Sequence, residues 1–156
     1  MSVPRVDRLT ESGWRAFATL RLQALTETLG ARDPQHREES AFTAAQWRRR
    51  LRIHAQFAVF VDDRAVGLIG AQRDRAESVY LYSLWLDPAV RGQGLARVLV
   101  SAAVQWANEE GARIVTLRVH HANTSARTVY ERLGFRVVAA EDGDETAELT
   151  MSLGVD

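Results

Sequence analysis

The stretch "LWLDPAVRGQGLARVLV", residues 84–100, joins a hydrophobic strand to an amphipathic helix through a glycine-rich turn. Gly92, Gly94 and Ala96 leave the main chain of this turn nearly bare. A helix that follows such a turn offers the free N–H groups of its first residues, and the positive end of its dipole, to an anion. The same glycines would also suit a turn that binds nothing, and residues 91–97 alone do not separate the two interpretations.

Two well-known nucleotide-binding loops do not fit this turn. A dinucleotide fingerprint G-x-G-x-x-G that begins at Gly92 needs glycine at position 97, where the sequence has Arg97. A Walker loop needs a lysine, and all 20 basic residues of the chain are arginine. The pattern that fits is R-x-x-G-x-A over residues 91–96, preceded by Asp87 and Pro88.

Hydrophobic periodicity and turn residues around this junction predict alternating strands and helices. The expected strands cover residues 4–9, 56–61, 65–71, 78–86, 113–119, 135–140 and 146–153, and the expected helices cover 13–29, 43–54, 95–111 and 124–134. The polar stretch 31–40 is expected to be a loop. The resulting order, β-α-α-β-β-β-α-β-α-β-β, predicts a mixed α/β (α+β) fold, and we expect residues 1–156 to form a single domain.

The composition argues against several classes of function. The 156 residues are 46% hydrophobic, which is enough for the core of one ordinary domain. The 20 acidic and 20 basic residues balance, so nothing in the net charge points to nucleic acid or a membrane surface. Zero cysteine excludes disulfides, thiolate metal sites and a cysteine acyl-enzyme. Without a signal-peptide pattern or a membrane-length apolar run, we expect a cytoplasmic protein. We also expect no metal, because the adjacent His120 and His121 have no companion histidine or cysteine at a metal-ligand spacing.

A second motif favours the anion-site interpretation of the turn. The segment "NTSARTVYERLGF", residues 123–135, matches N-x-x-A-x-x-x-Y-E-x-x-G-F. Together with residues 84–100 it resembles the paired motifs of the GNAT superfamily of N-acyltransferases, and the order of expected elements from residue 4 to 153 resembles that family too. The resemblance implies a GNAT-like fold, in which a central mixed, mostly antiparallel sheet of six or seven strands is flanked by four helices.

The resemblance also implies acetyl-CoA as the co-substrate and suggests its contacts. Main-chain groups of Leu84, Trp85 and Leu86 would pair with the pantetheine arm as with an added strand. Asn123 would bind the arm from the other side. The pyrophosphate would lie on the backbone of the turn, which is formed by Arg91, Gly92, Gln93, Gly94, Leu95, Ala96 and Arg97.

Tyr130 is the general acid that the resemblance implies. Its phenol would lie near the thioester sulfur and protonate the departing thiolate. A phenol with a pKa of about 10 stays protonated at neutral pH and can still donate in the transition state. The structural alternative is a helix residue that packs under the sheet beside Val129 and Leu133. Direct attack of a primary amine in a ternary complex is expected, because the chain has neither cysteine nor a G-x-S-x-G elbow.

The sequence leaves the general base open. Members of the family it resembles often carry a glutamate on the strand before the turn, but residues 79–86 contain no acid. Glu77 lies just before that strand, and His120 lies at the end of the next one. The intrinsic pKa of histidine, about 6.5, makes His120 the better candidate. His120 could instead cap a loop, and ordered water could relay the proton without any side chain.

Candidate contacts to the acceptor lie on several segments. Strand alternation in residues 116–121 puts Arg118 and His120 on one face, from which Arg118 could bind a carboxylate. An exposed arginine paired with a neighbouring acid is the alternative. Tyr80 and Trp47 are expected to contact the acceptor, although Trp47 could equally face the core. The first two helices and their loop shape the acceptor cleft in the family, which adds His36, Glu38 and Glu39.

These observations favour an acetyl-CoA-dependent N-acetyltransferase that acts on a primary amine of a small molecule. A protein or peptide amine is the second candidate for the acceptor. A non-catalytic acyl-CoA-binding or sensing domain on the same scaffold is the alternative from another class. The late strands at 135–153 could supply an edge through which the chain pairs as a homodimer.

Overall fold

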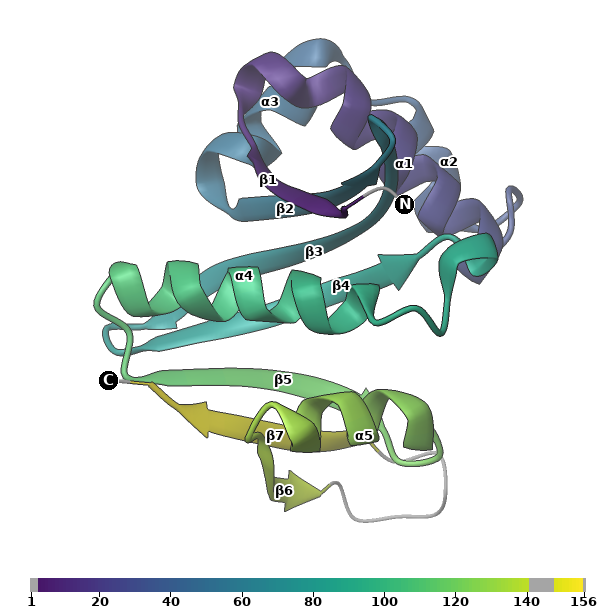
Figure 1. Cartoon of the computed structure of the whole chain (residues 1–156). Helices are drawn as coiled ribbons and strands as arrows, with labels where there is room; N and C mark the ends of the chain where they lie inside the picture. Colours follow the sequence, from purple (N-terminus) through teal and green to yellow (C-terminus); the bar gives the residue numbers. More distant parts are fainter. Residues whose placement is uncertain (1–2, 141–147, 156) are drawn as a thin grey trace.

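The computed structural model describes residues 3–140 and 148–155. The strands are β1 (Arg5–Leu9), β2 (Ala55–Val61), β3 (Arg64–Arg75), β4 (Ser78–Leu86), β5 (Ile114–His120), β6 (Arg136–Ala140) and β7 (Glu148–Gly154). The α-helices are α1 (Trp14–Thr28), α2 (Pro34–Ser40), α3 (Ala44–Ile53), α4 (Leu95–Glu109) and α5 (Thr124–Arg132). Figure 1 shows these elements arranged around one open sheet.

The sheet has the strand order β1-β2-β3-β4-β5-β7-β6. Every neighbouring pair is antiparallel except β4 and β5, which run parallel. Only residues 78–81 of β4 pair with β5, opposite residues 114–117. Beyond that short ladder the two strands diverge, as Figure 1 shows. The sheet is therefore continuous at one end of β4 and open at the other.

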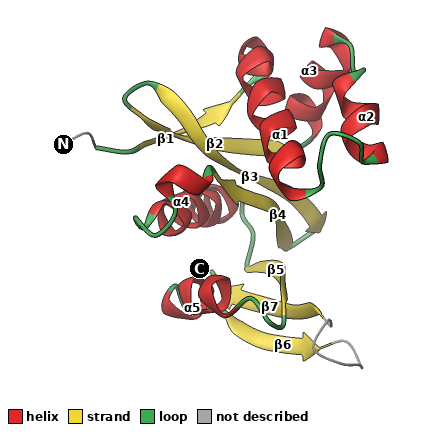
Figure 2. Cartoon of the chain, turned by 90° about the vertical axis from the view of Figure 1, so that its right-hand side faces the viewer, coloured by secondary structure: helices red, strands yellow, loops and turns green. Residues whose placement is uncertain are grey.

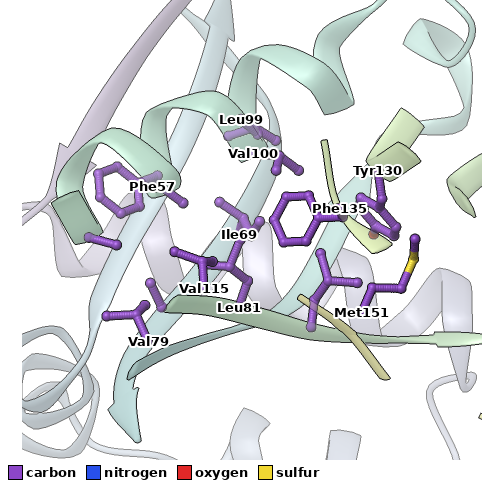
Figure 3. Close-up of a cluster of buried hydrophobic side chains, with 14 of the residues drawn as sticks. Phe57, Ile69, Val79, Leu81, Leu99, Val100, Val115, Tyr130, Phe135 and Met151 are labelled. Carbon is purple, nitrogen blue, oxygen red and sulfur yellow. The ribbon is translucent and has the colours of Figure 1, made fainter. Parts of the chain in front are cut away.

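Helices cover both faces of the sheet and bury two apolar clusters. Figure 2 shows α1, α2 and α3 on one side of the sheet and α4 and α5 on the other. Leu95, Leu99 and Ala103 of α4 recur at helical spacing and pack into the larger cluster, part of which Figure 3 shows. The smaller cluster lies between α1, α3 and the first half of the sheet. None of the helices in the described residues is long and apolar enough to cross a membrane.

The expected order of elements is confirmed apart from residues 31–40, which were expected to be a loop. The second half of this stretch is the helix α2, which makes five α-helices in the described residues instead of the expected four. Asp33 caps it, since its side chain accepts a hydrogen bond from the Gln35 N–H at 2.8 Å, and Pro34 occupies the first helical position. The expected strand 146–153 begins at Thr146 and Ala147, which lie outside the described residues.

Candidate functional site

A bulge in β4 lies where β5 separates from it. Leu68 of β3 pairs with Trp85, while Gly70 pairs with Tyr82, so β4 holds one more residue than β3 between these pairs. Ser83 inside the bulge has a φ of 56°, a left-handed conformation that strains a residue with a side chain. In the described part of the chain, no strand pairs with β4 beyond Leu81 on the β5 side. This edge of β4 can therefore accept an extended ligand.

A cavity of about 620 Å³ extends from this edge to the glycine-rich turn. It brings together both sequence motifs, because its walls come from β4, the turn and α5. Every residue expected to bind acetyl-CoA lines it except Gln93: Leu84, Trp85, Leu86, Arg91, Gly92, Gly94, Leu95, Ala96, Arg97, Asn123 and Tyr130. Glu27 and Thr28, at the end of α1, complete the wall.

The N-terminus of α4 opens into this cavity. Gly92 and Gly94 have φ values of 80° and 82°, and Gly94 caps the helix without any side-chain cap. A Cβ atom added to either glycine would meet nothing within 4 Å, so conformation rather than space requires glycine here. The N–H groups of the first helical turn have no carbonyl partner within the helix, and they face an anion favourably.

Glu27 links Trp85 and Arg91 at the wall of the cavity, and no sequence pattern predicted this role. Its carboxylate accepts hydrogen bonds from Trp85 Nε1 at 3.0 Å and from an Arg91 guanidinium nitrogen at 3.1 Å. The bond from Trp85, with the nearby charge of Arg91, lowers the pKa of Glu27. Arg91 also donates from Nε to the Leu86 carbonyl at 3.0 Å. These two contacts hold the Arg91 guanidinium beside the turn, where its side chain remains half exposed.

A second cavity, of about 250 Å³, lies in the opening between β4 and β5. Tyr82, Ser83 and Leu84 line it from β4, and Asn123 and Tyr130 line it from the opposite wall. Leu84, Asn123 and Tyr130 also line the larger cavity, so the two spaces meet at these residues. The Asn123 Oδ1 accepts the Ala126 N–H at 3.2 Å, which leaves its amide nitrogen available to a ligand.

Tyr130 is both a core residue and a cavity residue. It is 7% exposed, and its ring packs edge-on against Phe135 with 6.1 Å between centroids, as Figure 3 shows. Tyr130 also lines both the larger and the second cavity. Burial raises the pKa of Tyr130 to about 12, so the phenol is protonated at neutral pH. The structural alternative considered for Tyr130 therefore coexists with access to a ligand.

The two candidate bases from the sequence are placed differently. His120 lines the second cavity, but its Nδ1 accepts the Ala122 N–H at 3.2 Å, which is the loop-capping alternative. In the neutral ring the proton then lies on Nε2, and His120 must give up this hydrogen bond to accept another. Glu77 is 65% exposed near the paired end of β4, where it faces Arg113 at 3.8 Å.

A third cavity, of about 340 Å³, lies on the sheet face covered by α1 and α3. Tyr82 and Ser83 line it as well as the second cavity, so it adjoins the opening between β4 and β5. The remaining polar residues of its wall were not identified from the sequence, because they come from separate elements. They are Arg21, Gln35, Arg50, His54 and Gln56.

Glu39 was an expected acceptor contact, but it is buried behind the wall of the third cavity and binds the side chains that form this wall. Its carboxylate is buried and accepts from Arg21 Nε at 3.1 Å, Arg50 at 2.7 Å and Gln35 Nε2 at 3.0 Å. Burial by itself raises the pKa of Glu39, but the hydrogen bonds and the two positive charges outweigh it and hold that pKa below its usual value. Arg21 also reaches Ser83 Oγ at 3.3 Å, so this cluster contacts the bulge.

Three further acceptor candidates lie elsewhere. Trp47 was expected to contact the acceptor, and this is wrong, because it is 3% exposed and packs edge-on against Phe17 and Phe42 in the smaller core. Tyr80 lines a groove of about 530 Å³ on the open sheet face. Arg118 lines both this groove and the second cavity, and it faces away from the core as strand alternation predicted.

Comparisons with known proteins agree with this geometry. Residues 18–135 match the model of the acetyltransferase (GNAT) family. A mycothiol acetyltransferase of Propionibacterium freudenreichii is 31% identical over 117 residues, which are 69% of this chain and 38% of that protein. This chain therefore aligns with only part of each relative: the alignments with the Propionibacterium enzyme and two further relatives span 21–38% of the relatives' lengths.

Solved structures share the fold at low sequence identity. An acetyltransferase of the GNAT family from Streptococcus pneumoniae superposes with a TM-score of 0.77 at 17% identity, covering 98% of this chain and 100% of that one. The yncA protein of Salmonella typhimurium, solved with its cofactor acetyl-CoA, superposes with a TM-score of 0.75 at 18% identity, covering 99% and 95%. The expected GNAT-like fold is confirmed, and the chain belongs to the acetyltransferase (GNAT) family.

Proposed function

We propose that this protein transfers an acetyl group from acetyl-CoA to a primary amine of a small molecule. One observation carries the proposal: a single cavity of about 620 Å³ joins the bare N-terminus of α4 to the hydroxyl-bearing residue Tyr130 along an unpaired strand edge. An anion site, an edge for an extended arm and a proton donor thus line one space, in the order that acetyl-CoA requires.

The residues of this cavity have distinct proposed roles. The N–H groups of Leu95, Ala96 and Arg97 hold the pyrophosphate at the helix terminus. The backbone of Leu84 and Trp85 pairs with the pantetheine arm. The Asn123 amide donates to the arm from α5, and Leu86 contributes less because its carbonyl already accepts from Arg91.

Tyr130 and the second cavity supply the chemistry. Acetyl-CoA supplies an activated acetyl thioester, and the amine attacks it directly in a ternary complex. Tyr130 lies where the two cavities meet, and its protonated phenol donates to the departing sulfur. The third cavity, of about 340 Å³, is at the lower end of the size range of small-molecule pockets, which favours a small acceptor over a folded protein.

An assay of free thiol release tests this function. The protein is mixed with acetyl-CoA and a panel of primary amines, made up of a polyamine, an aminoglycoside, free amino acids and a short peptide. We expect acceptor-dependent thiol release with at least one small amine. Thiol release with the peptide alone would show that the protein is a peptide N-acetyltransferase and would contradict a small-molecule acceptor. Tight acetyl-CoA binding without release from any amine would instead support the sensing domain.

A further inference from the structure

We propose that Tyr82 and His54 form the path through which the acceptor amine loses its first proton. This inference rests on the proposed acetyltransferase function and concerns the base that the sequence left open. An amine with a solution pKa near 10 arrives mostly as ammonium, which cannot attack a thioester. The structure places a buried, hydrogen-bonded pair of side chains at the point where that proton must leave.

The sheet register holds Tyr82 in one position. Gln56 of β2, Gly70 of β3 and Tyr82 of β4 are paired across three adjacent strands. The Tyr82 ring lies over Gly70, since a Cβ atom there would approach the ring to 2.5 Å. A side chain at position 70 would therefore displace the ring. Glycine lets Tyr82 reach across β3 to Gln56 and to His54 at the end of α3.

Hydrogen bonds connect Tyr82 to His54 and to Gln56. Gln56 donates from Nε2 to Tyr82 Oη at 2.8 Å, and His54 Nδ1 lies 2.7 Å from the same oxygen. In the proposed relay Tyr82 donates its one proton to His54 Nδ1, while Gln56 occupies one acceptor position of Oη. His54 is then the neutral tautomer with its proton on Nε2. One acceptor position of Oη remains for the ammonium group.

The location suits an amine that approaches the thioester. Tyr82 lines both the second and the third cavity, and Tyr130 lines the second. An acceptor that enters through the third cavity therefore passes Tyr82 before it reaches the space beside Tyr130. His120 already accepts a backbone hydrogen bond, and Glu77 lies near the opposite end of β4, so neither matches this position.

The charges around His54 keep it neutral. Arg50 from its own helix α3, Arg21 from α1 and Tyr82 from β4 surround the same cavity, while Glu39 of α2 pairs with both arginines. Burial, and then the charge of Arg50, lower the pKa of His54 below its ordinary value. At neutral pH the ring is therefore free to accept a proton.

The amine nitrogen loses two protons, one through Tyr82 and His54 to solvent and one through Tyr130 to the sulfur. The ammonium gives one proton to Tyr82 Oη while Tyr82 gives its own to His54 Nδ1, and the imidazolium releases a proton from Nε2 to solvent. Exchange of the ring protons with solvent then restores the Nε2–H tautomer of His54 for the next turnover. The amine nitrogen then forms the C–N bond as the C–S bond breaks. The sulfur takes its proton from Tyr130, which is restored by the second proton of the nitrogen. The products are the acetamide, the CoA thiol and one proton in solution.

The first test needs no acceptor and is therefore independent of the proposed function. Imidazole ¹⁵N spectra of the full-length protein should show His54 at pH 7 as the neutral Nε2–H tautomer. Tyr82→Phe removes the hydrogen bond to Nδ1 and should move the Nδ1 resonance and the apparent pKa of His54. A His54 ring that is charged at pH 7, or that carries its proton on Nδ1, overturns the proposal whatever the enzyme acetylates.

The second test uses the best amine from the thiol-release panel. In the wild-type protein, kcat/KM should rise with pH through the His54 pKa and then level off. In Tyr82→Phe and His54→Gln, kcat/KM at pH 7 should fall about 10²-fold. It should also keep rising toward the pKa of the amine, since only the free base then reacts.

Three controls separate proton transfer from a structural role. His121→Gln replaces an exposed histidine of the loop between β5 and α5 and should keep the wild-type pH profile of kcat/KM. Acetyl-CoA affinity should remain within about twofold in both relay variants, because neither residue lines the larger cavity. A weakly basic amine, 2,2,2-trifluoroethylamine, should lose far less rate in the variants than ethylamine does. Equal losses with both amines, or an unchanged pH profile, would contradict the relay.

Discussion

Tyr130 belongs both to the core, where its ring packs beside Phe135, and to the walls of two cavities. Tyr130→Phe keeps the ring and removes only the hydroxyl. We expect kcat to fall about 10²-fold, because the departing thiolate loses its proton donor. Acetyl-CoA affinity, measured by calorimetry, should stay nearly unchanged. A loss of affinity as large as the loss of kcat would mean that the hydroxyl is structural.

The pH dependence of the same residue sharpens that test. Burial raises the pKa of Tyr130 to about 12, so the donating form is lost only as pH rises through that value. Ionisation of Tyr130 therefore causes no alkaline decrease in the wild-type rate below about pH 11. An alkaline limb near pH 9 that disappears in Tyr130→Phe would show instead that the phenol ionises much earlier.

At the scale of elements, the short helix α2 stabilises the wall of the third cavity through Glu39. Glu39→Gln removes the charge that compensates Arg21, whose side chain is only 15% exposed, and Arg50. We expect the free energy of unfolding at pH 7 to fall by about 3 kcal/mol, less than for a fully buried pair because Arg50 is partly exposed. Urea denaturation measures this loss. Glu38→Gln, the exposed neighbour, should change it by less than about 0.5 kcal/mol.

The sign of the pH effect follows from the lowered pKa of Glu39. Its stabilising contribution is present at neutral pH and is lost as pH falls through the folded-state pKa, below the ordinary value of 4.5. The difference between wild type and Glu39→Gln should therefore shrink below about pH 4. A difference that is constant from neutral to acidic pH would show that the carboxylate charge is not what stabilises this cluster.

The sequence predicts an element well when the residues that define it lie close together in the chain, and poorly when they come from distant segments. The helix α4 was predicted because Leu95, Leu99 and Ala103 repeat every turn. The residues that line the larger cavity were expected to lie together because they fall in two motifs, each of which is a continuous stretch of the chain. The helix α2 was missed because its residues are almost all polar, so only the cap Asp33 with Pro34 signalled it.

The third cavity was harder to predict because no local sequence pattern defines it. His54, Gln56 and Tyr82 come from three elements and meet only through the sheet register and the missing side chain of Gly70. Nothing adjacent to Ser83 in the sequence signals its bulge, which depends on pairing with β3. Trp47 was misassigned for a related reason, since helical periodicity cannot distinguish a core wall from a cavity wall.

At the scale of the whole molecule, the open end of β4 leaves the sheet in two parts. Strands β1 to β4 with α1, α2 and α3 meet strands β5 to β7 with α5 through four parallel residue pairs, and α4 packs across the junction. The larger cavity has walls in both parts. A ligand that fills this cavity contacts both parts and should hold them together. Local unfolding of β5 and α5 should therefore become rarer when acetyl-CoA binds.

Acetyl-CoA at 100 times its dissociation constant should stabilise the fold by about 2.7 kcal/mol and raise Tm by about 5–10 °C. Hydrogen exchange should slow in β5 and α5 as well as at the N-terminus of α4, because the pantetheine arm contacts both walls of the opening. 3′-Phosphoadenosine 5′-diphosphate, which keeps the pyrophosphate and lacks that arm, serves as the matched ligand. It should protect α4 alone, since in the proposed binding mode the pyrophosphate end touches only the glycine-rich turn and the first turn of α4. Equal protection of β5 by both ligands would mean that the two parts of the sheet are coupled through α4 and not through the arm.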